Sequence, residues 1–163
     1  MTSEAVTTQE AQEALKSIMI GAYLEEIRTH SIQTTLRFFS DQVRIGERIA
    51  VDLIFVCEAG VSLDDLSIES GGENFFSGRA RFLSQAYGLI GREISELHLQ
   101  DSGALTIRAE ASSIFLWLSN DDYGDDDWAW MVKHEQDPSS KTRGADPVYC
   151  MPEGDGVRFY VGV

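Results

Sequence analysis

The chain is poor in cysteine, in proline and in basic residues, and each shortage argues against a class of protein. Its two cysteines, Cys57 and Cys150, are far apart and form no paired metal or redox motif. In a cytosolic compartment we expect two reduced, partly buried thiols rather than a disulfide. Thirteen basic residues stand against 27 acidic ones, for a formal net charge of -14. Because phosphate neutralisation requires the opposite sign, nucleic-acid binding is disfavoured.

Long apolar runs are also lacking. The longest, Ile49 to Cys57, is interrupted by Asp52 and is too short to span a bilayer. The start, from Met1 to Glu4, has no cationic stretch leading into an apolar run, so we expect no secretory signal. A cytoplasmic protein without membrane association is predicted. The residues that are present, 43% hydrophobic and 25% charged over 163 positions, fit one globular domain with a substantial core.

Two segments have the apolar spacing of amphipathic helices. The first runs from about Gln9 to Ile20, where Thr7 and Glu10 have the spacing of a capping box and Gly21 is placed to end the helix. The second runs from about Phe76 to Ile90 and also ends at a glycine. Both helices are therefore expected to present one apolar stripe to the core.

Alternation of apolar and polar residues predicts strands with one buried face. The stretch from Asp137 to Gly156 holds all three prolines and predicts a long surface loop. The expected fold class is α+β, with two helices packed on antiparallel β-sheet. The predicted strands lie at residues 32–38, 49–55, 94–99, 104–109, 114–118, 128–132 and 157–161.

The two helix ends resemble each other in sequence. Residues 19–27 and 89–97 share the pattern apolar-Ile-Gly-x-x-apolar-x-Glu-apolar at an offset of 70. Downstream, with one residue of slippage, Leu36 corresponds to Leu105. Coincidence between two helix-to-strand junctions is the alternative, because short patterns recur freely. We interpret the chain as a single domain, residues 1–163, with two helix-plus-strands repeats at about 9–60 and 76–135.

The densest charge lies between Asn120 and Trp130, where five aspartates accompany a tyrosine and two tryptophans. This run could be a solvated loop, a surface that attracts a basic partner, or a divalent-metal site. Exposed carboxylates about 4 Å apart in water repel by only about 1 kcal/mol, so the run needs no ligand. The EF-hand pattern fails, since a register with Gly124 sixth puts Trp130 in place of the bidentate glutamate. The candidate partner-binding residues are Asp121, Asp122, Tyr123, Asp125, Asp126 and Asp127.

Charge is also uneven over the whole chain. There is no basic residue between Arg48 and Arg79 or between Arg108 and Lys133, and these two windows hold 12 of the 27 acids. One continuous acidic surface is a hypothesis that follows. Trp128, Trp130 and Val132 alternate along a strand and are expected in the core, whereas Tyr123 is the better interface candidate.

Signatures of catalysis are few. His30, His98 and His134 lack metal-ligand spacing, and neither a nucleophile elbow nor a phosphate-cradling loop is present. Arg79 and Arg81 are expected on a solvated helix face. An enzyme is therefore not expected, and no cofactor is predicted.

The chain resembles small, acidic, single-domain bacterial proteins that act as immunity or antitoxin partners of secreted toxins. The resemblance rests on a helix ending in Ile-Gly, a strand, an alternating strand such as Leu105-Thr106-Ile107, and an acidic loop running into Trp128-Ala129-Trp130. It covers Ile90 to Val132 best. It implies a non-catalytic inhibitor that occludes a basic, often nuclease-like, toxin domain. The alternatives are a divalent-metal-dependent enzyme using the Asp121–Asp127 cluster, and an accessory or structural protein that forms a homodimer.

Overall fold

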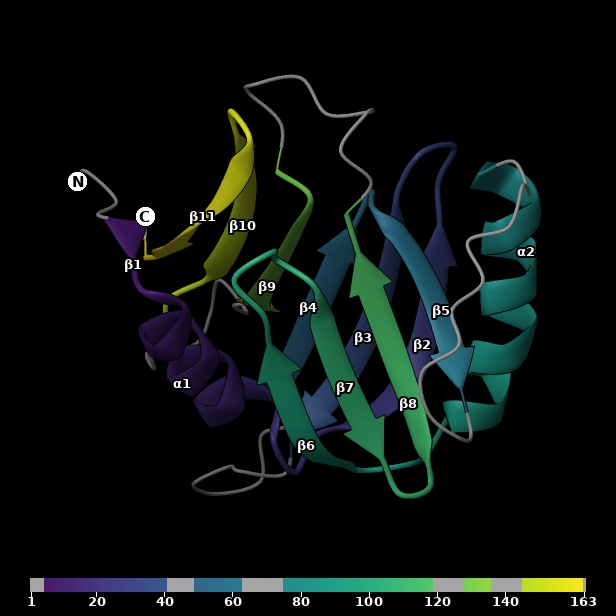
Figure 1. Cartoon of the computed structure of the whole chain (residues 1–163). Helices are drawn as coiled ribbons and strands as arrows, with labels where there is room; N and C mark the ends of the chain where they lie inside the picture. Colours follow the sequence, from purple (N-terminus) through teal and green to yellow (C-terminus); the bar gives the residue numbers. More distant parts are fainter. Residues whose placement is uncertain (1–4, 41–48, 63–74, 119–127, 136–144, 163) are drawn as a thin grey trace.

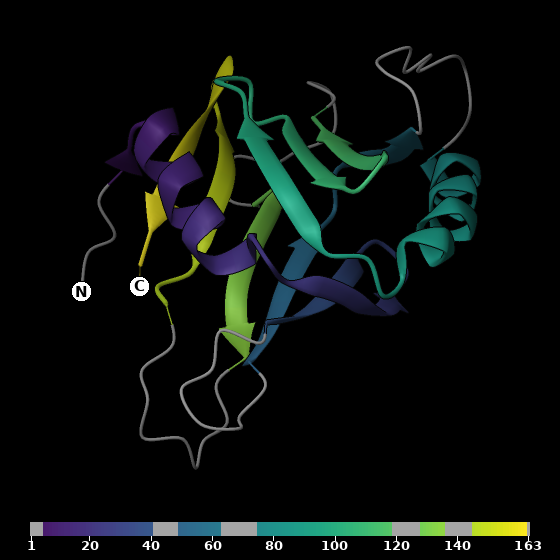
Figure 2. The same cartoon turned by 90° about the horizontal axis from the view of Figure 1, so that it is seen from below.

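A computed structural model describes residues 5–40, 49–62, 75–118, 128–135 and 145–162. Two antiparallel sheets lie face to face, and the two helices flank them on opposite sides (Figures 1 and 2). Among the described residues there are eleven strands and two α-helices of 12 residues each. The predicted α+β fold, with two helices packed on an antiparallel sheet, is therefore wrong: the fold is mainly β, and its core lies between two sheets.

The large sheet has seven strands in the order β1-β11-β10-β9-β4-β3-β2. Its inward positions carry apolar residues at every second place, and in β3 and β4 most outward positions are buried as well. The bounds of its strands are β1 Ala5–Val6, β2 Tyr23–Thr29, β3 Thr34–Ser40, β4 Ile49–Phe55, β9 Trp130–Glu135, β10 Val148–Glu153 and β11 Gly156–Val161.

The small sheet has four strands in the order β5-β8-β7-β6. Its inward residues, such as Leu97, Ile107 and Leu116, belong to the same buried cluster as Leu53 and Trp130 of the large sheet. One continuous core therefore holds the two sheets together. The bounds of its strands are β5 Glu58–Ser62, β6 Ile94–Leu99, β7 Leu105–Ala109 and β8 Ser112–Trp117.

Helix α1, Thr8–Met19, begins and ends where the sequence predicts. The Thr7 side chain accepts a hydrogen bond from the Glu10 amide, and the Glu10 carboxylate accepts one from the Thr7 amide, so the capping box is confirmed. The helix lies along β6, an outer strand of the small sheet. There the Gln12 side chain accepts a hydrogen bond from the Leu99 amide at 2.8 Å. Helix α1 thus covers a strand edge rather than a sheet face.

Helix α2, Phe75–Ala86, continues into a short 3-10 turn, η1, Tyr87–Leu89. It packs beside β5, the other outer strand of the small sheet. Phe82 is buried and meets the ring of Phe55 edge to face, with 5.6 Å between the centroids. This aromatic contact ties α2 to the large sheet as well.

The chain exchanges strands between the two sheets. Strand β5 follows β4 of the large sheet but pairs with β8, whereas β9 follows β8 of the small sheet but pairs with β4. Each half therefore adds its last strand to the other half's sheet. Local periodicity does not encode which strands pair, so this exchange is not predictable from the sequence pattern.

The two similar glycine junctions lie side by side and pair with each other. Gly21 and Gly91 have φ of 84° and 82°. The Gly21 amide donates to the Ile94 carbonyl at 2.9 Å, and the Gly91 amide donates to the Leu24 carbonyl at 2.7 Å. The two bonds correspond, because Gly91 is 70 residues after Gly21 and Ile94 is 70 residues after Leu24. Bulges also occur at matching places, between Leu24 and Glu26 in β2 and between Ile94 and Glu96 in β6.

The register corrects the proposed correspondence downstream. Leu36 pairs with Ile27, and Ile107 pairs with Leu97, so Leu36 matches Ile107 rather than Leu105. The matching geometry is a property of the described backbone. The interpretation as two repeats within one domain stays a prediction.

Two further expectations from the sequence are wrong. Ile32 does not open a strand; it lies in the β2–β3 turn with 66% of its surface exposed. The stretch from Asp137 to Gly156 is not one long loop, because β10 occupies Val148–Glu153. Pro152 fits in this strand at its last paired positions, opposite Val157 of the β10–β11 hairpin.

Candidate functional site

The six residues predicted to contact a partner, Asp121, Asp122, Tyr123, Asp125, Asp126 and Asp127, lie outside the described residues. Both flanks of this run are described. Strand β8 ends at Trp117 before it, and β9 begins at Trp130 after it. The aspartate run therefore belongs to the connection from the small sheet to the large sheet, and its role stays a prediction.

The second acidic segment attaches to the same strand pair. Ser62, the end of β5, pairs with Ser113 near the start of β8, whereas Glu58 pairs with Trp117 at the end of β8. Residues 63–74 and 119–127 hold nine acids and no basic residue. The described strand ends to which these segments attach lie at opposite ends of the β5–β8 pair (Figure 1).

Trp130 follows the aspartate run in the sequence but is a core residue. The indole is 0% exposed, donates a hydrogen bond from Nε1 to the Gly103 carbonyl at 2.8 Å, and packs on Phe159. Val132 is fully buried too, so the core interpretation of these two residues is confirmed. Trp128 precedes β9 and is only half-buried. Trp130 is thus a structural anchor at the start of β9.

A cluster of charges occupies the outward side of the large sheet. Arg37 of β3 forms two hydrogen bonds of 2.8 Å each with the Asp52 carboxylate of β4. Glu135 of β9 approaches the same guanidinium at 2.6 Å. Hydrogen bonding to Asp52, reinforced by the nearby charge of Glu135, raises the pKa of Arg37 above its ordinary value. This guanidinium is therefore a fixed charge, suited to fastening three strands rather than to proton transfer.

Other arginines also lie close to acidic side chains, most of them at the surface. Five of the seven in the described residues form ion pairs with acidic side chains: Arg28 with Glu26, Arg37 with Asp52 and Glu135, Arg92 with Glu110, Arg108 with Glu96, and Arg158 with Glu153. Arg79 is half-buried and donates to the carbonyls of His30 and Ser31, whereas Arg81 is exposed, as expected for a solvated helix face. Much of the positive charge is thereby matched by internal partners.

Burial shifts the pKa of both Cys150 and His134. Cys57 and Cys150 are both buried and unbridged. Burial raises the pKa of the Cys150 thiol to about 12, so the thiolate is scarce at neutral pH. His134 accepts a hydrogen bond at Nδ1 from the Ala145 amide at 2.9 Å, and burial lowers its pKa. That contact fixes the ring to the backbone that leads into β10.

Within the described ranges, no group of three or more His, Cys, Asp or Glu side chains could hold a metal ion. The described part of the chain also contains no helix of the length and apolarity needed to cross a membrane. The aspartates of the metal alternative are among the residues that are not described. This finding therefore does not test whether the aspartate run binds a metal ion.

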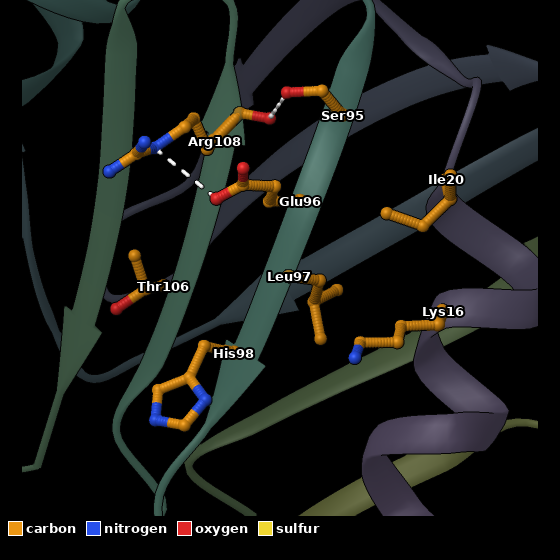
Figure 3. A pocket seen from close by; sticks show the side chains of 8 residues that line it. All are labelled: Lys16, Ile20, Ser95, Glu96, Leu97, His98, Thr106 and Arg108. Carbon is orange, nitrogen blue, oxygen red and sulfur yellow. Dashed lines mark hydrogen bonds and ion pairs between the residues drawn. The ribbon is translucent and has the colours of Figure 1, made fainter.

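A groove of about 550 Å³ lies between α1 and the outward side of the β6–β7 hairpin (Figure 3). Its charged and titratable side chains come from three elements: Lys16 from α1, Glu96 and His98 from β6, and Arg108 from β7. Ile20 and Leu97 supply apolar surface. The groove is a mixed site with three basic side chains and one acid.

Sequence reasoning missed both the Arg37 cluster and the groove. Arg37 and Asp52 each occupy an outward position in a strand pattern that was recognised, but alternation does not say which strands are neighbours. Lys16 and Arg108 are 92 residues apart and line one groove only because α1 packs beside β6. A pairing of charged residues on facing strands was the only local signal available.

Comparison with known proteins adds no relative: no family model matches the chain, and neither the curated proteins nor the solved structures give a match.

Proposed function

We propose that this chain is a non-catalytic acidic protein that binds a basic protein partner, with inhibition of a basic, nuclease-like toxin domain as its specific role. The observation that carries the proposal is the distribution of charge. Residues 63–74 and 119–127 hold nine acids without a basic residue. Five of the seven described arginines are meanwhile engaged with acids elsewhere in the fold.

Runs of acids without a basic residue favour the attraction of a basic partner. A high net negative charge raises the local concentration of a basic partner and accelerates encounter, and steering weakens as salt is added. Asp121, Asp122, Asp125, Asp126 and Asp127 would supply steering and contacts at the rim of the interface. Tyr123 would supply the buried anchor, because tyrosine contributes strongly at the centre of interfaces.

The test begins with capture from the source cell at low salt, elution by salt, and identification of the bound protein. Association kinetics with that partner are then measured for a variant in which all five aspartates of the run are changed to asparagine. We expect association to slow by about tenfold at low ionic strength and to lose most of its salt dependence.

A charge-matched control distinguishes an effect of the aspartate run from an effect of the lower net charge. It neutralises five exposed acids on described elements instead: Glu13, Glu25, Glu93, Glu110 and Asp155. Both variants carry the same net charge. The proposal requires the control to associate faster than the variant of the aspartate run. Equal rates for the two variants would refute a role for the run, and a captured partner that is not basic would refute the proposal itself.

A further inference from the structure

Two cations that line the groove between α1 and β6–β7, Lys16 and Arg108, lack a close hydrogen-bonded ion pair within the described part of the protein. The Arg108 guanidinium and the Glu96 carboxylate are 3.6 Å apart, and their side chains are 52% and 68% exposed. This separation exceeds the 2.7–2.9 Å or so of a charge-assisted hydrogen bond. Lys16 projects from α1 toward β6 in Figure 3, and among the described residues its side chain has no hydrogen-bond or ion-pair partner.

The matching surface of the other half provides an internal comparison. Arg37 lies between Glu26 and Asp52 on the neighbouring strands, just as Arg108 lies between Glu96 and Ser113. The carboxylate that binds Arg37 in two hydrogen bonds is thus replaced by a serine beside Arg108.

The neighbouring positions differ in the same direction. Arg28 pairs with Thr35 across the strands, and His98 pairs with Thr106 in the matching place. Arg28 is held by Glu26 in two hydrogen bonds of 2.7 and 2.8 Å, whereas His98 is exposed and has no side-chain partner among the described residues. In the first half, Arg28 and Arg37 are each paired with a carboxylate. In the second half, the matching residues His98 and Arg108 line a groove.

We propose that this groove binds a small organic anion through its carboxylate or phosphate group. Arg108 of β7 would be the main ligand of the oxyanion, and Lys16 and His98, which line the same groove, would add positive charge and a hydrogen-bond donor. Ile20, which is half-buried at the end of α1, offers apolar surface to the rest of the ligand. The volume of about 550 Å³ falls in the range of small-molecule sites.

Glu96 competes with the ligand in this arrangement. Among the described residues that line the groove, Glu96 supplies the one carboxylate, which already faces Arg108 (Figure 3). An incoming oxyanion would take over the guanidinium, and the exposed Glu96 side chain would turn to solvent. Two substitutions at one ion pair therefore have opposite expected effects. Arg108→Gln removes the anion's main ligand, whereas Glu96→Gln frees it.

The test is a titration of the full chain followed by amide chemical shifts, with inorganic phosphate and butyrate as separate probes. Saturable shifts are expected in residues 95–98 and 106–108 and at the end of α1, with millimolar dissociation constants. R108Q should weaken binding by about tenfold, and E96Q should strengthen it severalfold. Arg158→Gln is the matched control, because it removes an arginine of similar exposure, 58%, and should leave binding unchanged.

The two probes separate the sources of the oxyanion. Saturation by phosphate alone assigns a phosphorylated ligand, saturation by butyrate alone assigns a carboxylate, and saturation by both assigns the shared chemistry. If neither phosphate nor butyrate gives saturable shifts, the proposal is overturned. Equal binding by the wild type, R108Q and E96Q would also overturn it, because the shifts would then arise away from the groove.

Discussion

Arg37 and Asp52 show how single residues secure the large sheet. Both are buried, at 9% and 5% exposure, and they face each other across β3 and β4. A buried charge is costly unless it is paired and hydrogen-bonded, and the two 2.8 Å bonds meet that requirement. Glu135 adds a third strand to the same guanidinium. The pair therefore favours one register of three neighbouring strands.

The first prediction concerns this pair. Asp52→Asn leaves the buried guanidinium with one acid fewer and should lower the free energy of unfolding by about 3 kcal/mol. Glu153→Gln breaks the exposed pair with Arg158 and should cost less than about 1 kcal/mol. Urea unfolding of both variants measures the difference. Equal losses would show that burial adds nothing to the Arg37 pair.

The second prediction concerns His134 and pH. Because burial lowers its pKa below the ordinary value of 6.5, the unfolded chain takes up a proton on this residue at higher pH than the folded chain does. The contribution of His134 to stability is therefore complete above about pH 6.5 and is lost as the pH falls from there toward the folded-state pKa. Protonation at Nδ1 would also break the bond from the Ala145 amide.

His134→Asn keeps an acceptor for that amide but cannot titrate. The free energy of unfolding, measured from about pH 7.5 down to pH 5.5, should fall less steeply for this variant than for the wild type. Parallel curves for the two proteins would contradict the assignment of that pH dependence to His134.

At the scale of elements, the β6–β7 turn joins the two sheets. Gly103 has φ of 84°, and its carbonyl accepts the hydrogen bond of Trp130 from β9. A Cβ at this position would lie 2.8 Å from Cys150 Sγ of β10 and would also meet Leu118. Both the backbone conformation and the space therefore require glycine here.

The third prediction separates these two requirements. Gly91 has a similar φ of 82°, but a Cβ there would meet nothing within 4 Å. Gly91→Ala should cost about 1–2 kcal/mol from backbone strain alone. Gly103→Ala should cost about 1–3 kcal/mol more, because the turn is also overpacked. Thermal and urea unfolding measure both, and equal costs would mean that the Gly103 turn relaxes freely.

The sequence predicts elements well where their periodicity is complete. Helix α1 and its capping box are correct, and strands β4 and β6 are predicted with the observed bounds. Strand β2 was missed because Glu25 and Glu26 and the bulge beside them interrupt the alternation. Strand β10 was missed because its proline suggested a loop. Local patterns thus gave most strands but neither their order nor the division into two sheets.

At the scale of the whole molecule, the site is only partly visible in the sequence. The density of acids in residues 119–127 needs no structure to be recognised. The groove beside α1 depends on the packing of residues far apart in the chain, such as Lys16 and Arg108. Arg37 and Glu135 likewise come together only because β9 pairs with β4. A single sequence contains no local signal for either arrangement.

The distribution of charge along the chain then links the fold to the proposed function. Nine acids in the two segments that adjoin β5 and β8 carry most of the net charge of -14. Such charge acts over about 8 Å at physiological ionic strength and more weakly as salt is added. A protein that uses it to attract a basic partner must therefore show salt-dependent association.

The association rate constant with the captured partner, measured across a series of salt concentrations, is the most direct test. For the wild type we predict a steep fall with ionic strength, and for the variant with the five aspartates neutralised a rate about tenfold lower at low salt and nearly independent of salt. The charge-matched control should keep most of the wild-type slope. A wild-type rate that does not change with salt, or that survives neutralisation of the run, would contradict the account.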